Sequence, residues 1–243
     1  YADALPALAD DNHRIHTDFK QALTATGRLS SADPNLQNIP IKTKMGRQMR
    51  KYFITDEGYT LVDADYSQIE LRLLAHIADD YNMREAFING EDIHRKTAAA
   101  VFGFPDEMVN EEMRKRAKAV NFGIVYGISE FSLAEDIGVS RWEAKGYIDS
   151  YLAHYSGVRE YMKQVVIDAR EKGYTETLYG RRRWIPELKS SNFNIRSGAE
   201  RIALNTPIQG TAADLIKLAM IRVDAALRRD FPQAKLILQV HDE

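Results

Sequence analysis

The alternation of apolar and polar residues changes character twice along this chain. Near the start, two β-prone runs, 51–55 and 59–65, are joined by a turn at 56–58 and are predicted to be strands. Near the end, the apolar run 236–240 predicts a further strand. Between these regions apolar residues recur at helical spacing, so the pattern predicts strands followed by a long, mostly helical middle.

Helices account for most of that middle, with predicted bounds of 82–88, 92–102, 110–126, 131–137, 140–155 and 157–171. Another helix is expected after Asp65, because Ser67 and Glu70 have the spacing of a capping box. Its apolar stripe is Leu71, Leu74, Ala75 and Ala78. Segments 174–178 and 182–185 predict a small hairpin. Residues 193–230 predict a helix interrupted near Pro207, since proline lacks the N–H and clashes with the preceding turn.

Three acidic residues lie at the ends of two predicted strands: Asp65 is the last residue of 59–65, and Asp242 and Glu243 follow 236–240 after His241. If these strands share a sheet, distant carboxylates meet at its edge, and the helical middle projects from it as an insertion. Paired carboxylates suit hard divalent cations, and two such ions about 3.5–4 Å apart can serve phosphoryl transfer. Solvated strand ends are the alternative, and Asp63 competes with Asp65 because it lies on the same strand face.

A second pattern runs along the helix predicted at 110–126. Arg114, Lys118, Phe122 and Tyr126 recur every four residues and form one stripe about 18 Å long. Cations at one end suit a triphosphate, and rings at the other suit a sugar and a base. An ordinary surface helix with two core aromatics is the alternative, although cations near a helix N-terminus are unfavourable unless an anion binds there.

Composition narrows the class of protein without identifying it. The chain has 243 residues, 44% hydrophobic and 28% charged, with a net charge of −2, which indicates a globular protein with a sizeable core. Any nucleic-acid surface must therefore come from local clusters of Lys and Arg. Cysteine is absent, which excludes disulfides and thiolate metal sites. No apolar run approaches the ~18 residues that span a bilayer. Both ends are expected to be cut from something longer.

Five segments together resemble family A DNA polymerases, in that family's order. Residues 65–72 (DYSQIELR) are similar to the first palm motif and 240–243 (VHDE) to the second. The residues Arg114, Lys118, Phe122, Gly123, Tyr126 and Gly127 are spaced as in the fingers-helix motif. Segments 26–31 (TGRLSS) and 207–214 (PIQGTAAD) also match. The similarity runs from about residue 13 to the end.

The resemblance implies an α+β fold, with an antiparallel palm sheet, a large mostly helical fingers insertion and a right-hand polymerase architecture that lacks the thumb. The implied domains are a first palm part at 1–78, fingers at 79–192, and a second palm part at 193–243 that is truncated at the second catalytic motif. No 3′–5′ exonuclease constellation is found in this sequence, so no proofreading by these residues is expected.

The resemblance also implies roles for individual residues. Asp65 and Asp242 correspond to the metal-bridging pair, with the main-chain carbonyl of Tyr66 as a further ligand and Glu243 as an auxiliary carboxylate. Lys118 corresponds to a catalytic general acid toward pyrophosphate. The implied dNTP-binding residues are Arg114, Lys118, His94, Phe122, Tyr126, Glu70 and Gln68. Phe122 would pack on the sugar, Tyr126 would lie near the templating base, and Glu70 would exclude a 2′-OH.

DNA-binding roles follow in the same way for Arg28, Arg201, Asn205, Gln209 and His241. Of these, Arg28, Asn205 and Gln209 correspond to readers of the minor groove, where every base pair presents acceptors. The expected cofactor is Mg²⁺, as two ions, with Mn²⁺ able to substitute. The expected partners are primer–template DNA and dNTP, with no membrane, for a monomer in the bacterial cytoplasm at the nucleoid.

Three functions are consistent with these residues. The first is a template-directed DNA polymerase core, a nucleotidyltransferase of DNA replication and repair. The second is a fragment that binds dNTP or primer–template but turns over weakly or not at all. The third is a metal-dependent nuclease that uses the same carboxylates, against which the dNTP-binding helix argues.

Overall fold

The computed structural model describes residues 4–40 and 43–243. Residues 1–3 and 41–42, which belong to the predicted first palm part, lie outside the description. The chain divides into two compact units, one formed by residues 1–67 with 213–243 and the other by residues 68–212. The longest helix, α9 (Phe193–Asp230), contributes to both units. No helix among the described residues is long and apolar enough to cross a bilayer.

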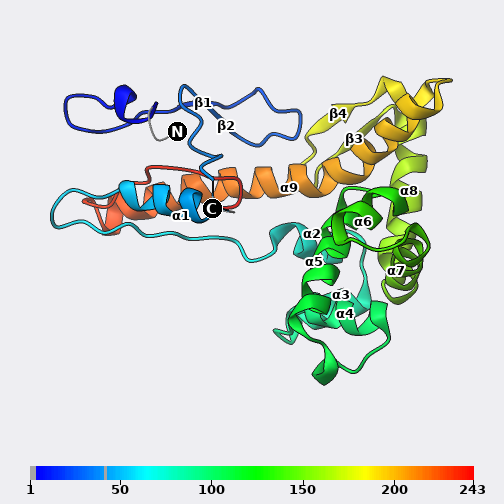
Figure 1. Ribbon diagram of the computed structural model, residues 1–243. Helices are drawn as coiled ribbons and strands as arrows, with labels where there is room; N and C mark the ends of the chain where they lie inside the picture. Colours follow the sequence, from blue (N-terminus) through cyan, green and yellow to red (C-terminus); the bar gives the residue numbers. More distant parts are fainter. Residues whose placement is uncertain (1–3, 41–42) are drawn as a thin grey trace. The chain divides into compact units, whose positions relative to one another are not determined.

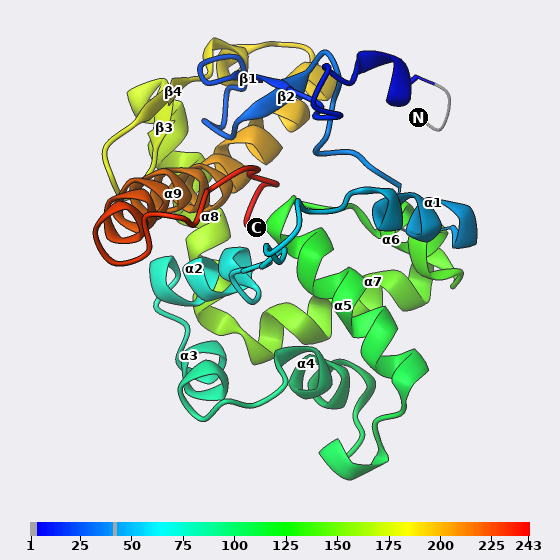
Figure 2. The same ribbon diagram turned by 90° about the vertical axis from the view of Figure 1, so that its left-hand side faces the viewer.

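The unit at 68–212 is mostly helical. Its helices are α2 (Ile69–Ile77), α3 (Tyr81–Ile88), α4 (Ile93–Phe102), α5 (Glu111–Val125), α6 (Glu130–Ile137), α7 (Arg141–His154), α8 (Ser156–Lys172) and the first part of α9, with single 3-10 turns at Asp106–Met108 and Pro186–Lys189. Figure 2 shows α4, α5 and α7 gathered in this unit, where α5 packs on α4, α2, α6 and α7. The six helices predicted between 82 and 171 are confirmed, each to within two residues at either end.

The apolar residues whose helical periodicity predicts these helices form the core of this unit. Leu71 and Leu74 of α2, Val120 of α5, Leu133 of α6 and Tyr151 of α7 are all at most 1% exposed and belong to one cluster. Asp80 fastens two helices to this core, since its carboxylate accepts from the Met83 N–H of α3 and the Gly157 N–H of α8. Such capping satisfies main-chain donors that a helix start leaves unpaired.

The predicted start of α2 is wrong. The N-cap position is occupied by Gln68 and not by Ser67; Gln68 is in the left-handed conformation (φ 57°) and contributes no side-chain cap. The buried Glu70 carboxylate accepts a hydrogen bond from the Tyr126 hydroxyl at 3.0 Å. Glu70 therefore has a partner 56 residues away, which its local sequence does not indicate.

The predicted hairpin is confirmed. Strands β3 (Tyr174–Glu176) and β4 (Arg182–Trp184) pair antiparallel, with Tyr174 opposite Trp184 (Figure 1). The turn between them reaches α9: Arg181 donates to the Gly210 carbonyl at 3.0 Å, and the Leu178 N–H donates to the Thr211 hydroxyl at 3.0 Å. The hairpin thus packs its turn against the helix that carries Pro207.

The predicted interruption near Pro207 is wrong, because α9 continues through it. Proline removes one donor from the ladder, but nearby carbonyls find other donors. Besides the bond from Arg181 to Gly210, the Tyr161 hydroxyl donates to the Leu204 carbonyl at 3.1 Å, and the Thr206 hydroxyl donates to the Ile202 carbonyl at 2.7 Å. Tertiary and side-chain hydrogen bonds of this kind allow a helix to accommodate proline.

Apart from the second part of α9, the other unit contains little regular structure. Strands β1 (Asp18–Lys20) and β2 (Ser30–Ala32) form a second antiparallel pair, followed by α1 (Lys44–Met49), with 3-10 turns at Pro6–Leu8 and Arg50–Tyr52 (Figure 1). The turn expected at 56–58 is present, since the Tyr59 N–H donates to the Asp56 carbonyl and Gly58 has a φ of 84°.

The predicted strands at 51–55, 59–65 and 236–240 are not formed, and neither is the sheet they were expected to share. A β-prone run becomes a strand only when a neighbouring strand completes its hydrogen-bond ladder. No such ladder involves these runs within the described residues. Several of their apolar side chains accordingly face solvent, as at Val62, which is 84% exposed. The fold is therefore mostly helical, with two small antiparallel sheets.

Candidate active site

The predicted acidic residues of the first unit do meet, although not at strand ends. The Tyr66 N–H donates to the Asp242 carbonyl at 3.1 Å and joins the two segments through their main chains. The last turn is closed by reciprocal bonds between Val240 and Glu243, at 2.9 and 3.0 Å. His241 occupies the tip of this turn in the left-handed conformation (φ 59°). Asp65, Tyr66, Asp242 and Glu243 thus belong to one small, mutually bonded region.

The electrostatics of this region are those of crowded negative charge. Partial burial, with the charges of Asp242 and Asp63, raises the pKa of Asp65 above its usual value. Partial burial, with the charge of Asp63 and a hydrogen bond to it, also raises the pKa of Glu243, while Arg50 acts in the opposite sense. Asp63, the competitor of Asp65 in the sequence, therefore lies beside Glu243. Nearby carboxylates resist ionising together, which is the environment that a bound cation relieves.

The donor chemistry fits a hard divalent cation. Among the residues that the structure describes, no three His, Asp or Glu side chains are grouped as a complete metal cage. Asp65 and Asp242 nevertheless supply carboxylate oxygens beside the Tyr66 main chain, and such oxygens are what Mg²⁺ prefers, with further positions left for water and phosphate. Two carboxylates with open positions match a substrate-bridging ion better than a closed structural site.

His241 and Arg28 also lie near one another in this unit. Burial lowers the pKa of His241, and the positive charge of Arg28 lowers it further, while Asp242 opposes both. Gln239 fixes the turn that carries the ring, because its side-chain amide donates to the His241 carbonyl at 2.6 Å. Gln37 in turn donates to the Gln239 carbonyl at 3.1 Å. Two of the predicted DNA-binding residues are thus brought together beside the acidic region.

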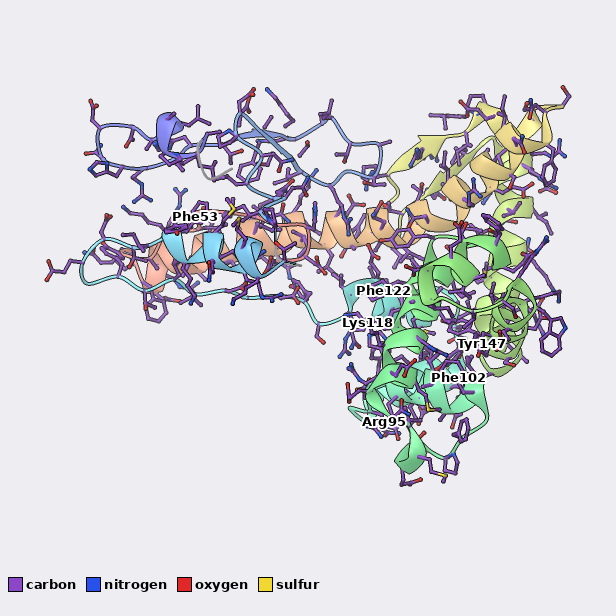
Figure 3. All side chains as sticks on the ribbon, viewed as in Figure 1. Phe53, Arg95, Phe102, Lys118, Phe122 and Tyr147 are labelled. Atoms are coloured by element: carbon purple, nitrogen blue, oxygen red, sulfur yellow. The ribbon has the colours of Figure 1, made fainter. Side chains whose placement is uncertain are left out.

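The predicted stripe in the second unit lies on α5 and its C-terminal end. Arg114, Lys118 and Phe122 are helical, and Tyr126 is the residue that follows the helix. Figure 3 labels Lys118 and Phe122 next to each other along α5, and the Lys118 ammonium is 5.9 Å from the centre of the Phe122 ring. The two aromatic rings are not core residues as the alternative required: Tyr126 is 40% exposed and Phe122 is only partly buried.

The cations of α5 are organised by residues of α4. Arg114 Nε donates to Asp92 Oδ2 at 2.7 Å, and Asp92 also caps α4 by accepting from the main-chain N–H groups of His94 and Arg95. Although partial burial opposes it, these hydrogen bonds hold the pKa of Asp92 below its usual value. His94 is 2% exposed, and burial, reinforced by the charges of Arg114 and Lys118, lowers its pKa to about 4. Arg114, Lys118 and a neutral His94 thus form one cationic cluster.

The two glycines of the motif, Gly123 and Gly127, lie at the C-terminal end of α5. An added Cβ at Gly123 would come within 2.8 Å of Ile128 Cγ2, and Gly127 has a φ of 66°. Close packing and helix termination therefore explain them. A hollow of about 520 Å³ opens beside them, lined by Phe122, Tyr126, Ser129, Ser132 and Arg201 among others. Arg201 packs its Cγ over Gly127, which puts one predicted DNA contact beside the rings.

The remaining predicted DNA-binding residues of this unit lie one turn apart on α9. Asn205 Nδ2 donates to Gln209 Oε1 at 3.3 Å, and both side chains are partly exposed.

Two residues that the sequence prediction does not include contact the cationic cluster: Asp92 binds Arg114, and Asn121 binds His94. The signal for Asn121 was present, because it occupies the core-facing positions of α5 with Ala117, Val120 and Ile124. A polar residue there requires a buried partner.

Comparison with known proteins matches the chain along its whole length. The family model described as DNA polymerase family A covers residues 1–243. The chain is 57% identical to DNA polymerase I of Bacillus subtilis (strain 168) over 240 residues, 98% of this chain and 27% of that protein. It is 53% identical to DNA polymerase I of Pseudomonas aeruginosa over 244 residues, 100% of this chain and 27% of that protein. The chain therefore spans about a quarter of the length of these relatives.

A solved structure has the same fold. It is described as the POL domain of Pol1 from M. smegmatis in complex with DNA primer-template and dNTP. The TM-score is 0.93 and the identity 48%, over 99% of this chain and 42% of that chain.

Proposed function

The chain belongs to DNA polymerase family A, and from that premise we propose that it carries out template-directed addition of dNTPs to a primer 3′-OH. The observation that carries the proposal is the cluster on α4 and α5, where Arg114, Lys118 and neutral His94 precede Phe122 and Tyr126 along one stripe. A cationic end followed by an aromatic end suits a nucleoside triphosphate.

The finer architecture is part of the same proposal. The mostly helical segment 79–192 is the fingers, and residues 1–78 and 193–243 are palm. The compact units divide elsewhere, at 67/68 and 212/213, because α2 packs into the helical core. The proposal also includes a monomer acting at the nucleoid, in keeping with the bacterial relatives.

The acidic region would hold the metal. The proposed ligands of two Mg²⁺ ions, for which Mn²⁺ can substitute, are Asp65, Asp242 and the Tyr66 carbonyl. Glu243 is an auxiliary carboxylate beside them. When bound, such ions supply Lewis-acid charge at the attacking and leaving oxygens of phosphoryl transfer. Tyr66 and Asp242 are held in register by their main-chain hydrogen bond. Side chains of the protein bind and orient the substrates and transfer the proton.

Those groups grip the nucleotide and its pairing partner. Arg114, with Nε engaged by Asp92, presents its remaining guanidinium donors to phosphate oxygens, and Lys118 presents its ammonium. Lys118 can then pass a proton to the pyrophosphate oxygen as the bond to the α-phosphorus breaks. Phe122 packs on the sugar, Gln68 contacts the nucleotide, and Tyr126 lies by the templating base. The proposed DNA contacts are Arg28, Arg201, Asn205, Gln209 and His241.

Single-nucleotide extension of a labelled primer–template, in Mg²⁺ and each dNTP in turn, tests the proposal. It is run with this chain alone and with this chain as part of a polymerase of its relatives' length, called the parent enzyme below. Extension only by the template-matched dNTP supports it. Release of nucleotides from DNA without dNTP would instead identify a nuclease. If the parent extends and the chain alone only binds, dNTP should quench the exposed Trp142 or Trp184 in the wild type and less so in Lys118→Ala.

Glu70 provides a separate prediction about sugar selection. The residue is 6% exposed and its carboxylate is held by the Tyr126 hydroxyl, so the side chain is a rigid obstacle of defined volume. We expect Glu70→Ala to reduce the preference for dNTP over NTP by about 10- to 100-fold, measured as the ratio of kcat/KM values in the parent enzyme. Glu70→Gln keeps the volume and should retain most of the preference. Unchanged selectivity in Glu70→Ala would remove Glu70 from this role.

A further inference from the structure

A buried polar network lies behind the cationic cluster. Asn121 of α5 and Thr97 of α4 are both fully buried, as is Tyr155 at the junction of α7 and α8. Asn121 Nδ2 is 3.1 Å from His94 Nδ1 and 3.0 Å from Thr97 Oγ1. Thr97 Oγ1 is 2.8 Å from the Ile93 carbonyl and 3.1 Å from the Tyr155 hydroxyl. Three helical elements are thus joined to one face of the His94 ring.

In the orientation of the Asn121 amide that the structure shows, each proton of this network has one acceptor. The Thr97 hydroxyl donates to the Ile93 carbonyl, which leaves its oxygen to accept from Tyr155 and from Asn121. The two protons of Asn121 Nδ2 then go to Thr97 Oγ1 and to His94 Nδ1. With the amide turned over, Nδ2 would still reach Thr97 Oγ1, because Asn121 Oδ1 is 3.1 Å from that oxygen, and His94 Nδ1 would instead donate to Asn121 Oδ1. The orientation of the amide in the structure, with Nδ2 toward the ring, makes Nδ1 of His94 an acceptor.

An acceptor at Nδ1 decides what the other nitrogen can do. A neutral imidazole has one proton, so Nε2 must carry it. Nε2 makes no hydrogen bond to any part of the chain that the structure describes. Since Nδ1 faces fully buried Asn121, the opposite edge of the ring faces away from that buried amide. Arg114 and Lys118 are close enough to affect the ring's charge, so an anion that they attract would meet this N–H.

We propose that Asn121 is a positioning residue, whose amide holds His94 in the Nε2–H tautomer so that the ring donates to the phosphate oxygens of the incoming nucleotide. The inference rests on the proposed function, because it needs a triphosphate at α5. Asn121 itself touches no substrate. A buried amide is costly unless its hydrogen bonds are made, and here one of those bonds fixes a ring that would otherwise exchange its proton between two nitrogens.

The tautomer can be measured without nucleotide. In the ¹⁵N-histidine-labelled chain at neutral pH, His94 is assigned with His94→Gln, and one- and two-bond couplings identify the protonated nitrogen. We expect Nε2–H in the wild type. In Asn121→Asp the carboxylate accepts instead, so we expect a proton at Nδ1. A wild-type ring protonated at Nδ1 would overturn the proposal. Because this measurement uses the wild type, it does not depend on whether an Asn121 variant folds.

The functional consequence is tested by a double-mutant cycle on dNTP binding in Mg²⁺, followed by tryptophan fluorescence. Asn121→Ala should weaken binding about tenfold, but no more than about twofold further when His94 is already Ala. Tyr155→Phe, which removes the far hydroxyl of the network and leaves the Asn121 contact, should bind nearly as the wild type does. Equal losses from Asn121→Ala in both backgrounds would mean a structural role and sink the proposal. If the wild type binds no dNTP while the tautomer is as expected, the proposed function fails instead.

Discussion

Replacing Asp65 or Asp242 by asparagine is expected to lower nucleotide addition by the parent enzyme at least about a thousandfold, equivalent to about 4 kcal/mol in the activation free energy. Asparagine keeps the size of the side chain but removes the negative charge that a divalent cation requires. Rates would be measured by single-turnover primer extension in Mg²⁺. Retention of normal extension by either variant would remove that residue from the metal site.

The same substitution should not harm the fold, and this separates loss of chemistry from loss of structure. Burial and neighbouring carboxylates raise the pKa of Asp65. A raised pKa in the folded state means that the ionised form is less favourable there than in the unfolded chain, so stability falls as pH rises through the titration. Asp65→Asn should therefore unfold at an equal or higher temperature than the wild type at neutral pH, and the gain should vanish in acid, where Asp65 is protonated in both states.

Asp63→Asn is the matched control, because Asp63 belongs to the same acidic region but is assigned no metal. It should relieve the repulsion at Glu243 and leave extension within a few-fold of the wild type. Mg²⁺ or Mn²⁺ should raise the unfolding temperature of the wild type and of Asp63→Asn, and not that of Asp65→Asn, because a ligand that binds only the folded state stabilises it. The reverse pattern would assign the metal to Asp63.

What the sequence predicts well is what depends on neighbours in sequence. The helices between 81 and 172 follow from apolar periodicity, which is local. Because α5 is helical as predicted, Arg114, Lys118 and Phe122 lie along one side of it. The runs at 59–65 and 236–240 have strand-like composition but no ladder within the described residues, and composition alone cannot supply one. The carboxylates still meet, through the hydrogen bond from Tyr66 to Asp242.

Long-range contacts account for the other errors. Ser67 and Glu70 have the right spacing for a capping box, but the N-cap residue is Gln68, and the Glu70 carboxylate accepts from the distant Tyr126 hydroxyl. Pro207 should break a helix, but the β3–β4 turn and α8 supply donors to the carbonyls around it. Asp92 could not be singled out from its own surroundings, because its role depends on Arg114, 22 residues further along the chain.

The second large effect is expected at Lys118. Arg114 is tied to Asp92, whereas Lys118 is exposed and forms no ion pair within residues 4–40 and 43–243. Lys118→Ala should lose a charged hydrogen bond to phosphate, worth about 1.5–3 kcal/mol, and the proton transfer, worth about 10²–10⁴ in rate. We expect kcat/KM for dNTP to fall by about three orders of magnitude or more in the parent enzyme. Lys115→Ala, an exposed cation on the same helix with no assigned role, is the control for loss of general charge.

Lys118→Arg divides this effect into its two parts. Arginine keeps the positive charge and the phosphate contact, so KM for dNTP should return to near the wild-type value. Its guanidinium does not give up a proton in proteins, so kcat should stay about a hundredfold low. Recovery of kcat by arginine would show that Lys118 contributes charge alone. Since His94 is neutral at working pH with its pKa near 4, and Arg114 cannot transfer a proton, Lys118 is then the group of this cluster that can both hold the pyrophosphate and protonate it.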